Sequence, residues 1–272
     1  MAVPYLSCMH THTHYCDGSN PPEVLIQKAL ELGFVSVGFS GHGCSPHDLV
    51  GMLPENERSY RAEIRQLQKD YADQIEILLG VEHDYWGVYP DYPYDYMIES
   101  IHYIRKNGTQ YSVDHTAEIA RDAIREGFGG DVYAYCREYY RTCAEAYAQS
   151  PAQIAGHLDL VTKFNERMPV IDESDPRYLQ PAMEALECAV RRGLVVEVNT
   201  GGMAKGYRTS PYPNPVFLRR LRELGGQVMI NSDCHNAEKL AYWYPEAVEL
   251  LRACGFDHGV ILRKDGFHEV GI

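Results

Sequence analysis

The sequence predicts an α/β barrel, in which parallel strands alternate with helices around a closed sheet. Seven short apolar runs recur along the 272 residues, and helix-like segments separate most of them. Because the runs lack polar alternation, they are typical of strands buried on both faces of a parallel sheet. Each run also ends in a polar cluster, and barrel enzymes collect their active sites at the carboxyl ends of the strands. These observations favour a barrel over an open sheet.

The expected strands and helices can be placed in order along the chain. The strands cover residues 3–9, 34–39, 75–81, 96–101, 153–156, 194–198 and 227–231. The helices cover residues 21–33, 59–72, 131–149, 180–193, 214–226 and 245–255. The first helix opens on two prolines and closes on Gly33, as helices commonly do. The chain has no low-complexity linker and no repeat, so we expect residues 1–272 to form a single domain.

Composition excludes several classes of protein. The net charge of −13, without any run of lysine or arginine, argues against nucleic-acid binding, which needs a basic surface. There is no apolar run long enough to span a membrane. The chain shows no signal-peptide pattern, and its eight cysteines form no CxxC pair, so we expect reduced thiols and a cytoplasmic protein. Its oligomeric state is not indicated.

Six of the seven strand ends carry residue types that bind metal ions. The clusters are HTH at 10–12, SGH at 40–42, EHD at 82–84, His102, GHLD at 156–159 and SDCH at 232–235. Alternate residues of a strand share a face, so His10 and His12 can address one ion. Asp233 and His235 have the same spacing. The alternative for an isolated HxH pair is an ordinary surface strand, but the recurrence at successive strand ends favours a metal site.

Nine residues form the predicted ligand set. They are His10, His12, Asp17, His42, Glu82, His102, His157, Asp233 and His235. Nine ligands exceed what one ion accepts and suit two or three Zn, Mn or Fe ions, with the carboxylate of Glu82 able to bridge two of them. The set contains no cysteine, which favours a catalytic site over a structural one. Multinuclear sites of this kind typically catalyse hydrolysis.

The remaining histidines fit a structural role better. His14 would share the face of His10 only if the strand continued, and the following YCDGS is typical of a turn. His47 lies further from its strand than His42, and His83 points to the face opposite Glu82. We also expect structural roles for His115, His258 and His268.

Six ordered motifs resemble those of the PHP (polymerase and histidinol phosphatase) superfamily. HTHTHYCDG resembles the element HxHTxxSDG, GHG the element TDH, GVEHDY the element GxExDY, IESIHYI the element GSxHxx, IAGHLDLVTKFN the element GHxDxxxKFN, and NSDCH the element SDAH. The chain departs from these patterns at Cys8, Cys16 and Gly41. The segments SVDHTAE, GHLDLVTKFNE and EVNTGGMAKGYRTSPYPNP are similar to the stand-alone histidinol-phosphate phosphatases of the superfamily.

This resemblance implies a distorted (β/α)7 TIM-like barrel with a trinuclear metal site at the carboxyl ends of its strands. By similarity, His10, His12, Glu82 and Asp233 would bind one ion. Glu82, His102 and His157 would bind a second, and Asp17, His42 and His235 a third. Some relatives place a histidine at the position of Gly18, so Asp17 has the least support from the resemblance.

The resemblance also implies a metal-dependent phosphatase that hydrolyses L-histidinol phosphate to L-histidinol and phosphate in histidine biosynthesis. Lys163, Lys205 and Arg208 lie in segments that resemble substrate loops, and Asn199 ends a strand beside them; surface exposure is the alternative for each cation. Relatives often have arginine where Lys205 stands, and bidentate phosphate recognition needs that arginine. Asp233 and His235 are candidates for protonating the leaving oxygen.

Three alternative functions remain open at this point. The chain could hydrolyse another small phosphomonoester, or act as a phosphodiesterase or nuclease of the same superfamily. It could also be a metal-binding module without turnover, although the complete ligand set argues against that.

Overall fold

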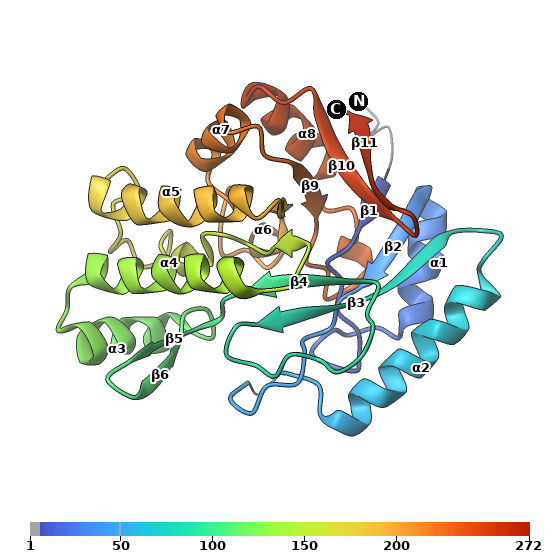
Figure 1. The fold of residues 1–272 in the computed structure, drawn as a ribbon, viewed down its shortest axis with the longest axis horizontal. Coiled ribbons are helices and arrows are strands. Elements are labelled where there is room, and N and C mark those ends of the chain that lie inside the picture. The colour runs from blue at the N-terminus through green and yellow to red at the C-terminus, as the bar shows by residue number, and fades with distance from the viewer. Residues whose placement is uncertain (1–5, 49) are drawn as a thin grey trace.

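Seven parallel strands curl into a nearly closed barrel, as the sequence predicts (Figure 1). The computed structural model describes residues 6–48 and 50–272, so the first part of the expected strand 3–9 lies outside it. In their order around the sheet, the strands are β1 (Leu6–Cys8), β2 (Phe34–Phe39), β3 (Glu76–Asp84), β4 (Tyr96–Ser100), β7 (Ile154–Ala155), β8 (Val195–Asn199) and β9 (Val228–Asn231). Every neighbouring pair is parallel, so all carboxyl ends meet at one mouth of the barrel.

Helices cover the outside of the sheet. The six that the sequence predicts are α1 (Pro22–Leu32), α2 (Pro54–Asp70), α4 (Val132–Gln149), α5 (Pro176–Arg191), α7 (Pro215–Glu223) and α8 (Tyr244–Ala253). Several begin at a proline behind a capping residue: the side chains of Asp175 and Asn214 accept hydrogen bonds from the first turns of α5 and α7. Figure 1 shows α4 and α5 lying side by side, and their buried side chains, among them Tyr139, Tyr140 and Leu186, belong to the largest apolar cluster.

The first and last barrel strands meet just beyond their ends. The His12 N–H donates to the Cys234 carbonyl at 2.8 Å, and the Cys234 N–H donates to the His10 carbonyl at 3.1 Å. These bonds bring the HTH and SDCH segments together. Closure of the barrel therefore places two predicted ligand pairs against each other.

The interior of the barrel is apolar at the end opposite the carboxyl ends of the strands. Its side chains come from five strands and are Leu78, Ile98, Ile154, Val195 and Met229. Val260 and Leu262 of β10 (His258–Arg263), which pairs with β11 (Gly266–Gly271), cover this end. Ser7 and Ser36 are buried polar residues near this end, where Ser36 Oγ donates to the Leu262 carbonyl at 2.9 Å, whereas the buried histidines and carboxylates of the predicted ligand set gather at the mouth.

A tyrosine fills the middle of the barrel and requires glycines beside it. The Tyr96 hydroxyl donates to the Met9 carbonyl at 2.5 Å. A Cβ atom on Gly80 would lie 2.3 Å from the Tyr96 ring, and one on Gly38 would lie 2.3 Å from its hydroxyl oxygen. Both distances are far below contact, so these positions admit only glycine without rearrangement.

Several elements were not predicted from the sequence. They are a hairpin of β5 (Tyr103–Lys106) and β6 (Thr109–Ser112), the helices α3 (Ala117–Phe128) and α6 (Gly201–Ala204), the 3-10 helices η1 (Leu160–Thr162) and η2 (Ala237–Lys239), and the β10–β11 hairpin. Asn107 and Gly108 connect β5 to β6 with positive φ angles of 51° and 81°, as two-residue hairpin turns require. This hairpin leads the chain directly to the mouth of the barrel.

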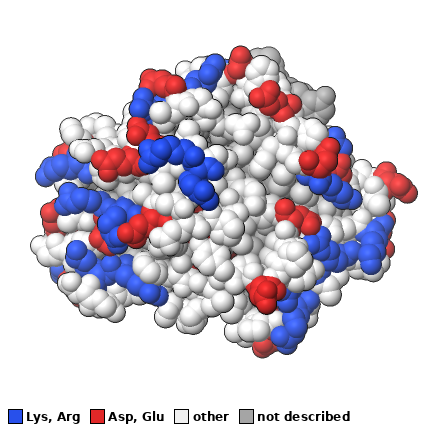
Figure 2. Space-filling view, in the orientation of Figure 1, with Lys and Arg blue, Asp and Glu red and all other residues white. Residues whose placement is uncertain are grey.

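The surface carries charges of both signs. On the face shown in Figure 2, lysine and arginine residues lie among aspartate and glutamate residues around the rim, and the centre is largely uncharged. Among the described residues, no helix combines the length and apolar character needed to cross a membrane. All eight cysteines are free thiols, six of them buried.

Candidate metal centre

Glu82 lies at the centre of a group of five imidazoles. Its Oε2 is 3.1 Å from His10 Nε2, 3.4 Å from His12 Nε2 and 3.1 Å from His42 Nδ1. Its Oε1 is 2.9 Å from His157 Nε2 and 3.3 Å from His102 Nε2. The five histidines follow β1, β2, β4 and β7, whereas Glu82 lies inside β3, two residues before its end. One buried carboxylate therefore faces ligands from four neighbouring strands.

Two further carboxylates complete the cluster. Asp233 Oδ1 is 3.2 Å from His12 Nε2 and 3.4 Å from His235 Nδ1. Asp17 Oδ2 is 3.0 Å from His235 Nε2, and its Oδ1 is 3.4 Å from His12 Nδ1. All nine predicted ligands are thus brought into one cluster at the carboxyl ends of the strands.

The local backbone explains how the two aspartates reach the cluster. A Cβ on Gly18 would lie 2.4 Å from the His12 carbonyl carbon, so a side chain at this position would push the turn, and Asp17 with it, away from His12. Asp233 has a positive φ of 47°, an uncommon conformation that aspartate tolerates better than most residues. Backbone strain of this kind concentrates at functional sites.

The donor atoms fall into four overlapping groups with spacing suited to metal ions. The groups are His12, Asp17, His42 and His235; His10, His12 and Asp233; His10, Glu82 and His157; and His42, Glu82 and His102. Within each group the donor atoms lie within 4.8 Å of one another. The groups share His10, His12, His42 and Glu82, as expected where a carboxylate bridges neighbouring ions.

The electrostatics of the cluster favour a bound cation. Burial of His12, with His235 and His42 close by, lowers its pKa to about 3, so this imidazole is neutral and able to bind a metal. Burial would lower the pKa of His10, but the surrounding carboxylates, Glu197 foremost, raise it well above its usual range. Burial would raise the pKa of Glu82, but the imidazoles around it, His10 foremost, lower it well below its usual range. A field that favours an extra proton on His10 favours a metal ion at the same place.

Unpartnered atoms show that the residues fit such an ion. His10 Nε2, His12 Nε2 and Glu82 Oε2 are buried and have no hydrogen-bond partner among the described residues, although they approach one another. Buried polar atoms are almost always paired, so each of these needs an explanation. Imidazole nitrogen and carboxylate oxygen are the donors preferred by Zn and similar divalent ions, and a shared ion would satisfy all three atoms.

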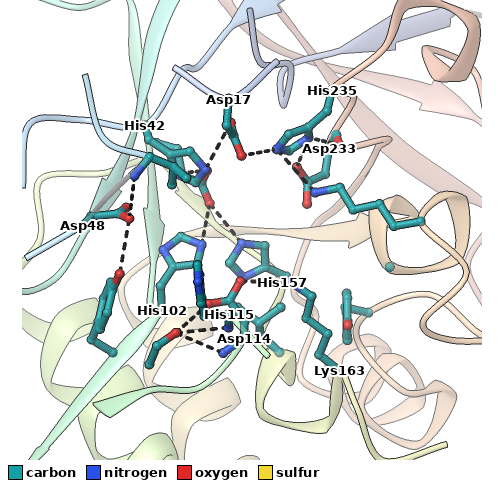
Figure 3. A pocket seen from close by; sticks show the side chains of 18 residues that line it. Asp17, His42, Asp48, His102, Asp114, His115, His157, Lys163, Asp233 and His235 are labelled. Atoms are coloured by element: carbon teal, nitrogen blue, oxygen red, sulfur yellow. Dashed lines mark hydrogen bonds and ion pairs between the residues drawn. The ribbon is translucent and has the colours of Figure 1, made fainter. Parts of the chain in front are cut away.

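A pocket of about 150 Å³ opens above the cluster. Figure 3 shows His102 and His157 on one side of it and Asp17, Asp233 and His235 on the other, with His42 next to Asp17. Lys163 and Lys205 also line it. Lys163 Nζ is 3.0 Å from Asp114 Oδ2, and Lys205 Nζ is 3.3 Å from His235 Nε2. Two cations therefore stand beside the predicted metal site.

The other two predicted substrate residues do not line this pocket. Arg208 is buried, and its guanidinium donates to the Thr162 carbonyl at 3.0 Å and pairs with Glu173 at 3.3 Å. Asn199 donates to Glu197 at 2.9 Å and accepts from the Gly201 N–H at 2.8 Å. These bonds hold the loop after β8 in place. Direct contact of Arg208 or Asn199 with the substrate stays a prediction.

Sequence reasoning missed several pocket residues. Asp48, Tyr103, Ser112, Asp114 and His115 all line the pocket, although only His115 had been considered, and it was given a structural role. The β5–β6 hairpin and the residues after it carry four of the five. The segment SVDHTAE was a signal for them, since it resembles the phosphatase branch, but its resemblance assigned no roles.

Apart from His115, the histidines that were expected to have structural roles belong to none of the four donor groups. His14 is exposed and its ring lies 4.3 Å from that of Tyr15. His47 is exposed, and Arg105 contacts it at 3.3 Å. His83 is buried, but its Nδ1 bonds to Glu99 at 3.1 Å and its ring stacks on Tyr89. His258 and His268 belong to the β10–β11 hairpin at the opposite end of the barrel.

Comparison with known protein families identifies the family to which this chain belongs. The model of the PHP domain matches residues 9–201, which is more than half of the chain and contains seven of the nine clustered ligands.

The chain belongs to the PHP domain family.

Named relatives of this PHP domain cover nearly its whole length. It is 29% identical to a Deinococcus radiodurans protein named "probable histidinol-phosphatase", over 90% of this chain and 92% of the relative. It is 26% identical to the histidinol-phosphatase of Bacillus subtilis, over 88% of this chain and 97% of the relative.

A solved structure has the same fold as this PHP domain. The histidinol phosphate phosphatase of Lactococcus lactis, complexed with Zn, L-histidinol and phosphate, matches with a TM-score of 0.72 at 21% identity. The match covers 96% of this chain and 98% of that structure. The distorted barrel is thereby confirmed as the fold of the family.

Proposed function

We propose that this protein is a metal-dependent phosphatase that hydrolyses L-histidinol phosphate to L-histidinol and phosphate. The observation that carries the proposal is the contact of Glu82 with five imidazoles at the floor of a pocket lined by two lysines. The names of the relatives in Deinococcus radiodurans and Bacillus subtilis support the choice of substrate. So does the zinc, histidinol and phosphate complex of the Lactococcus lactis structure.

The nine clustered residues are proposed to hold two or three divalent ions, of Zn, Mn or Fe. The four overlapping donor groups support more than one ion, and Glu82 is the proposed bridge. When bound, such ions polarise phosphoryl oxygens and lower the pKa of water. His10 presents Nε2 to this site, as does His12, while His42 presents Nδ1 toward Glu82.

The residues of the chain supply binding and proton transfer. Lys163 and Lys205 are proposed to contact the phosphate, because a dianionic ester needs positive donors and these are the cations that line the pocket among the described residues. Asp233 or His235 is proposed to deliver the proton to the leaving oxygen, since both line the pocket on the side opposite His102.

The proposed binding partner of the protein is a small phosphate ester. The proposed location of the protein is the cytoplasm. A pocket of about 150 Å³ suits a small molecule. The eight free thiols agree with a reducing compartment.

Steady-state hydrolysis of a phosphoester panel tests the proposal. The panel should contain L-histidinol phosphate, a sugar phosphate, a nucleotide and a phosphodiester, with metal analysis of the same purified protein. We expect L-histidinol phosphate to have a kcat/KM at least about 100-fold above the others, since a site built for polar groups discriminates strongly against ligands that lack them. Equal rates across the monoesters would defeat the substrate assignment, and preference for the diester would favour a phosphodiesterase.

Replacement of the bridging carboxylate or a buried imidazole tests the site itself. Glu82→Ala and His157→Ala should each abolish hydrolysis while the variants keep the circular dichroism of the wild type. Full activity in either variant would refute the assignment of the metal centre.

A further inference from the structure

A second buried carboxylate lies beneath the metal centre without reaching the pocket. Glu197, in the middle of β8, is fully buried and does not line the pocket. It faces the barrel interior, above the apolar layer that contains Val195. A carboxylate in this position costs free energy unless each oxygen is paired.

Both oxygens of Glu197 are paired, and the donors come from four segments. Its Oε2 lies 2.9 Å from His10 Nδ1 and accepts from Asn231 Nδ2 at 3.0 Å. Its Oε1 accepts from the His157 backbone N–H at 2.7 Å and from Asn199 Nδ2 at 2.9 Å. Glu197 therefore contacts the segments that carry two proposed ligands, His10 and His157.

The contact with His10 fixes which nitrogen of that ring carries the proton. A carboxylate paired in this way only accepts hydrogen bonds, so His10 Nδ1 must be the N–H donor. The other nitrogen, Nε2, lies 3.1 Å from Glu82 Oε2 and is therefore the atom at which a metal ion would take the place of a second proton. Only an unprotonated nitrogen binds a metal ion.

The chain contains a matched carboxylate that makes the same contact away from the pocket. Glu99 is also fully buried, lies 3.1 Å from the Nδ1 of buried His83 and accepts from Ser150 Oγ at 2.5 Å. His83, however, stacks on Tyr89 and belongs to none of the four donor groups. Glu99 and Glu197 thus share burial and contact with a histidine Nδ1, whereas Glu197 also accepts from Asn231, Asn199 and the His157 N–H, and its histidine faces the cluster.

From these contacts we infer that Glu197 is a positioning residue for the metal centre, which holds His10 in the Nδ1–H form and orients its Nε2 toward the ions. The inference rests on the proposed function. It assigns to Glu197 a role beyond joining strands, because removal of its acceptor oxygen would change His10 chemically and not only mechanically. Carboxylates behind metal-binding histidines act in this way in many metal sites.

The variant Glu197→Gln separates the structural role of Glu197 in joining strands from its proposed role in holding His10 in the Nδ1–H form. Glu197→Gln keeps the size of the side chain and one acceptor oxygen, which suffices for the His157 N–H. The new amide N–H2 would face His10 Nδ1, which then has to accept a hydrogen bond and shift its proton to Nε2. That proton would block the proposed ligand atom. Glu197→Asp keeps the charge and both acceptors but shortens the side chain.

The test compares zinc affinity in four full-length proteins: wild type, Glu197→Gln, Glu197→Asp and Glu99→Gln. Each is stripped of metal and titrated with zinc in competition with a chromophoric chelator, and thermal unfolding of the stripped proteins is recorded separately. We expect Glu197→Gln to weaken zinc binding about 10- to 100-fold, Glu197→Asp to lose less, and Glu99→Gln to stay within about threefold of wild type. Glu197→Gln should lose at least as much thermal stability as Glu99→Gln, because the Glu197 carboxylate joins four segments.

Four results would overturn the inference. Wild-type zinc affinity in Glu197→Gln is one, and an equal loss in Glu99→Gln is another. If Glu197→Gln does not fold, Glu197→Asp decides: zinc affinity reduced by 100-fold or more despite the retained carboxylate would show that shape, and not the acceptor, matters. A wild-type protein that binds no zinc, manganese or iron would overturn the metal site itself, and the inference with it.

Discussion

At the scale of single residues, the position of Glu82 makes the strongest prediction. Glu82→Gln preserves shape but removes the charge that faces five imidazoles. We expect kcat/KM for L-histidinol phosphate to fall about 1000-fold, because metal stabilisation of phosphoryl transfer is worth several kcal/mol and each 1.36 kcal/mol is a factor of ten. Steady-state kinetics and bound-metal analysis would check this. Glu99→Gln is the matched control, and an unchanged rate in Glu82→Gln would contradict the bridging role.

Lys205 allows a second prediction at this scale. Its Nζ lies beside His235 at the pocket wall. Lys205→Ala should lower kcat/KM about 10- to 100-fold, because a hydrogen bond from a charged donor contributes about 1.5–3 kcal/mol. Exposed Lys264, on the turn of the β10–β11 hairpin, provides the control variant Lys264→Ala. Equal kinetics in both variants would place phosphate recognition elsewhere.

Individual site residues could be predicted from the sequence where their spacing along a strand places them on one face. Alternation along a strand was enough to pair His10 with His12 and Asp233 with His235, and the structure brings each pair into the cluster. Alternation could not assign Glu197, because its neighbours in the run are apolar and a buried glutamate has no signature in a single sequence. Asp114 and Tyr103 could not be predicted either, since their position in the pocket depends on how the β5–β6 hairpin folds at the mouth of the barrel.

At the scale of elements, the regular barrel units were predictable and the additions to them were not. Apolar runs and proline–glycine boundaries predicted β2 at its observed bounds and the six main helices to within a few residues. The helix α3 was missed, although Thr116 caps it and Gly129 ends it, because a second helix between β4 and β7 breaks the alternation of the repeat. Both hairpins were missed because they too lie outside the alternation of one strand with one helix.

The packing of Tyr96 between strands gives an element-scale prediction. Gly80→Ala would place a methyl group against the Tyr96 ring, and overpacking of this kind costs about 1–3 kcal/mol. We expect a lower melting temperature and a lower denaturant midpoint. Gly271→Ala is the control, because no atom lies within 4 Å of its Cβ position and such changes usually stay within about 0.5 kcal/mol. Equal stability of the two variants would mean that the barrel interior adjusts freely around Tyr96.

At the scale of the whole molecule, metal binding and folding should be linked. The proposed ligands come from six of the seven barrel strands or the turns after them, so the unfolded chain cannot assemble them. Free metal at 100 times its dissociation constant should stabilise the fold by about 2.7 kcal/mol, which corresponds to roughly 5–10 °C in melting temperature. Thermal unfolding with graded zinc or a chelator would measure this shift. A melting temperature independent of metal would contradict the proposed site.

We also propose that residues 1–272 unfold as one domain. The parallel sheet runs without a break from β1 to β9, and β10 contacts both β1 and β9. Differential scanning calorimetry should therefore show a single transition in which the calorimetric and van't Hoff enthalpies agree. Two separated transitions would divide the chain into independent units.

The hydrogen bonds that join HTH to SDCH have a consequence for synthesis of the protein. Asp17 and His235 touch at 3.0 Å although 218 positions separate them in the chain. On the ribosome, the amino-terminal histidines emerge long before Asp233 and His235 are translated. A nascent or prematurely ended chain therefore lacks the complete ligand set, and the mature centre can load metal only after the last barrel strand has docked. Activity can therefore appear only after the chain has been synthesised through the last barrel strand and its SDCH segment.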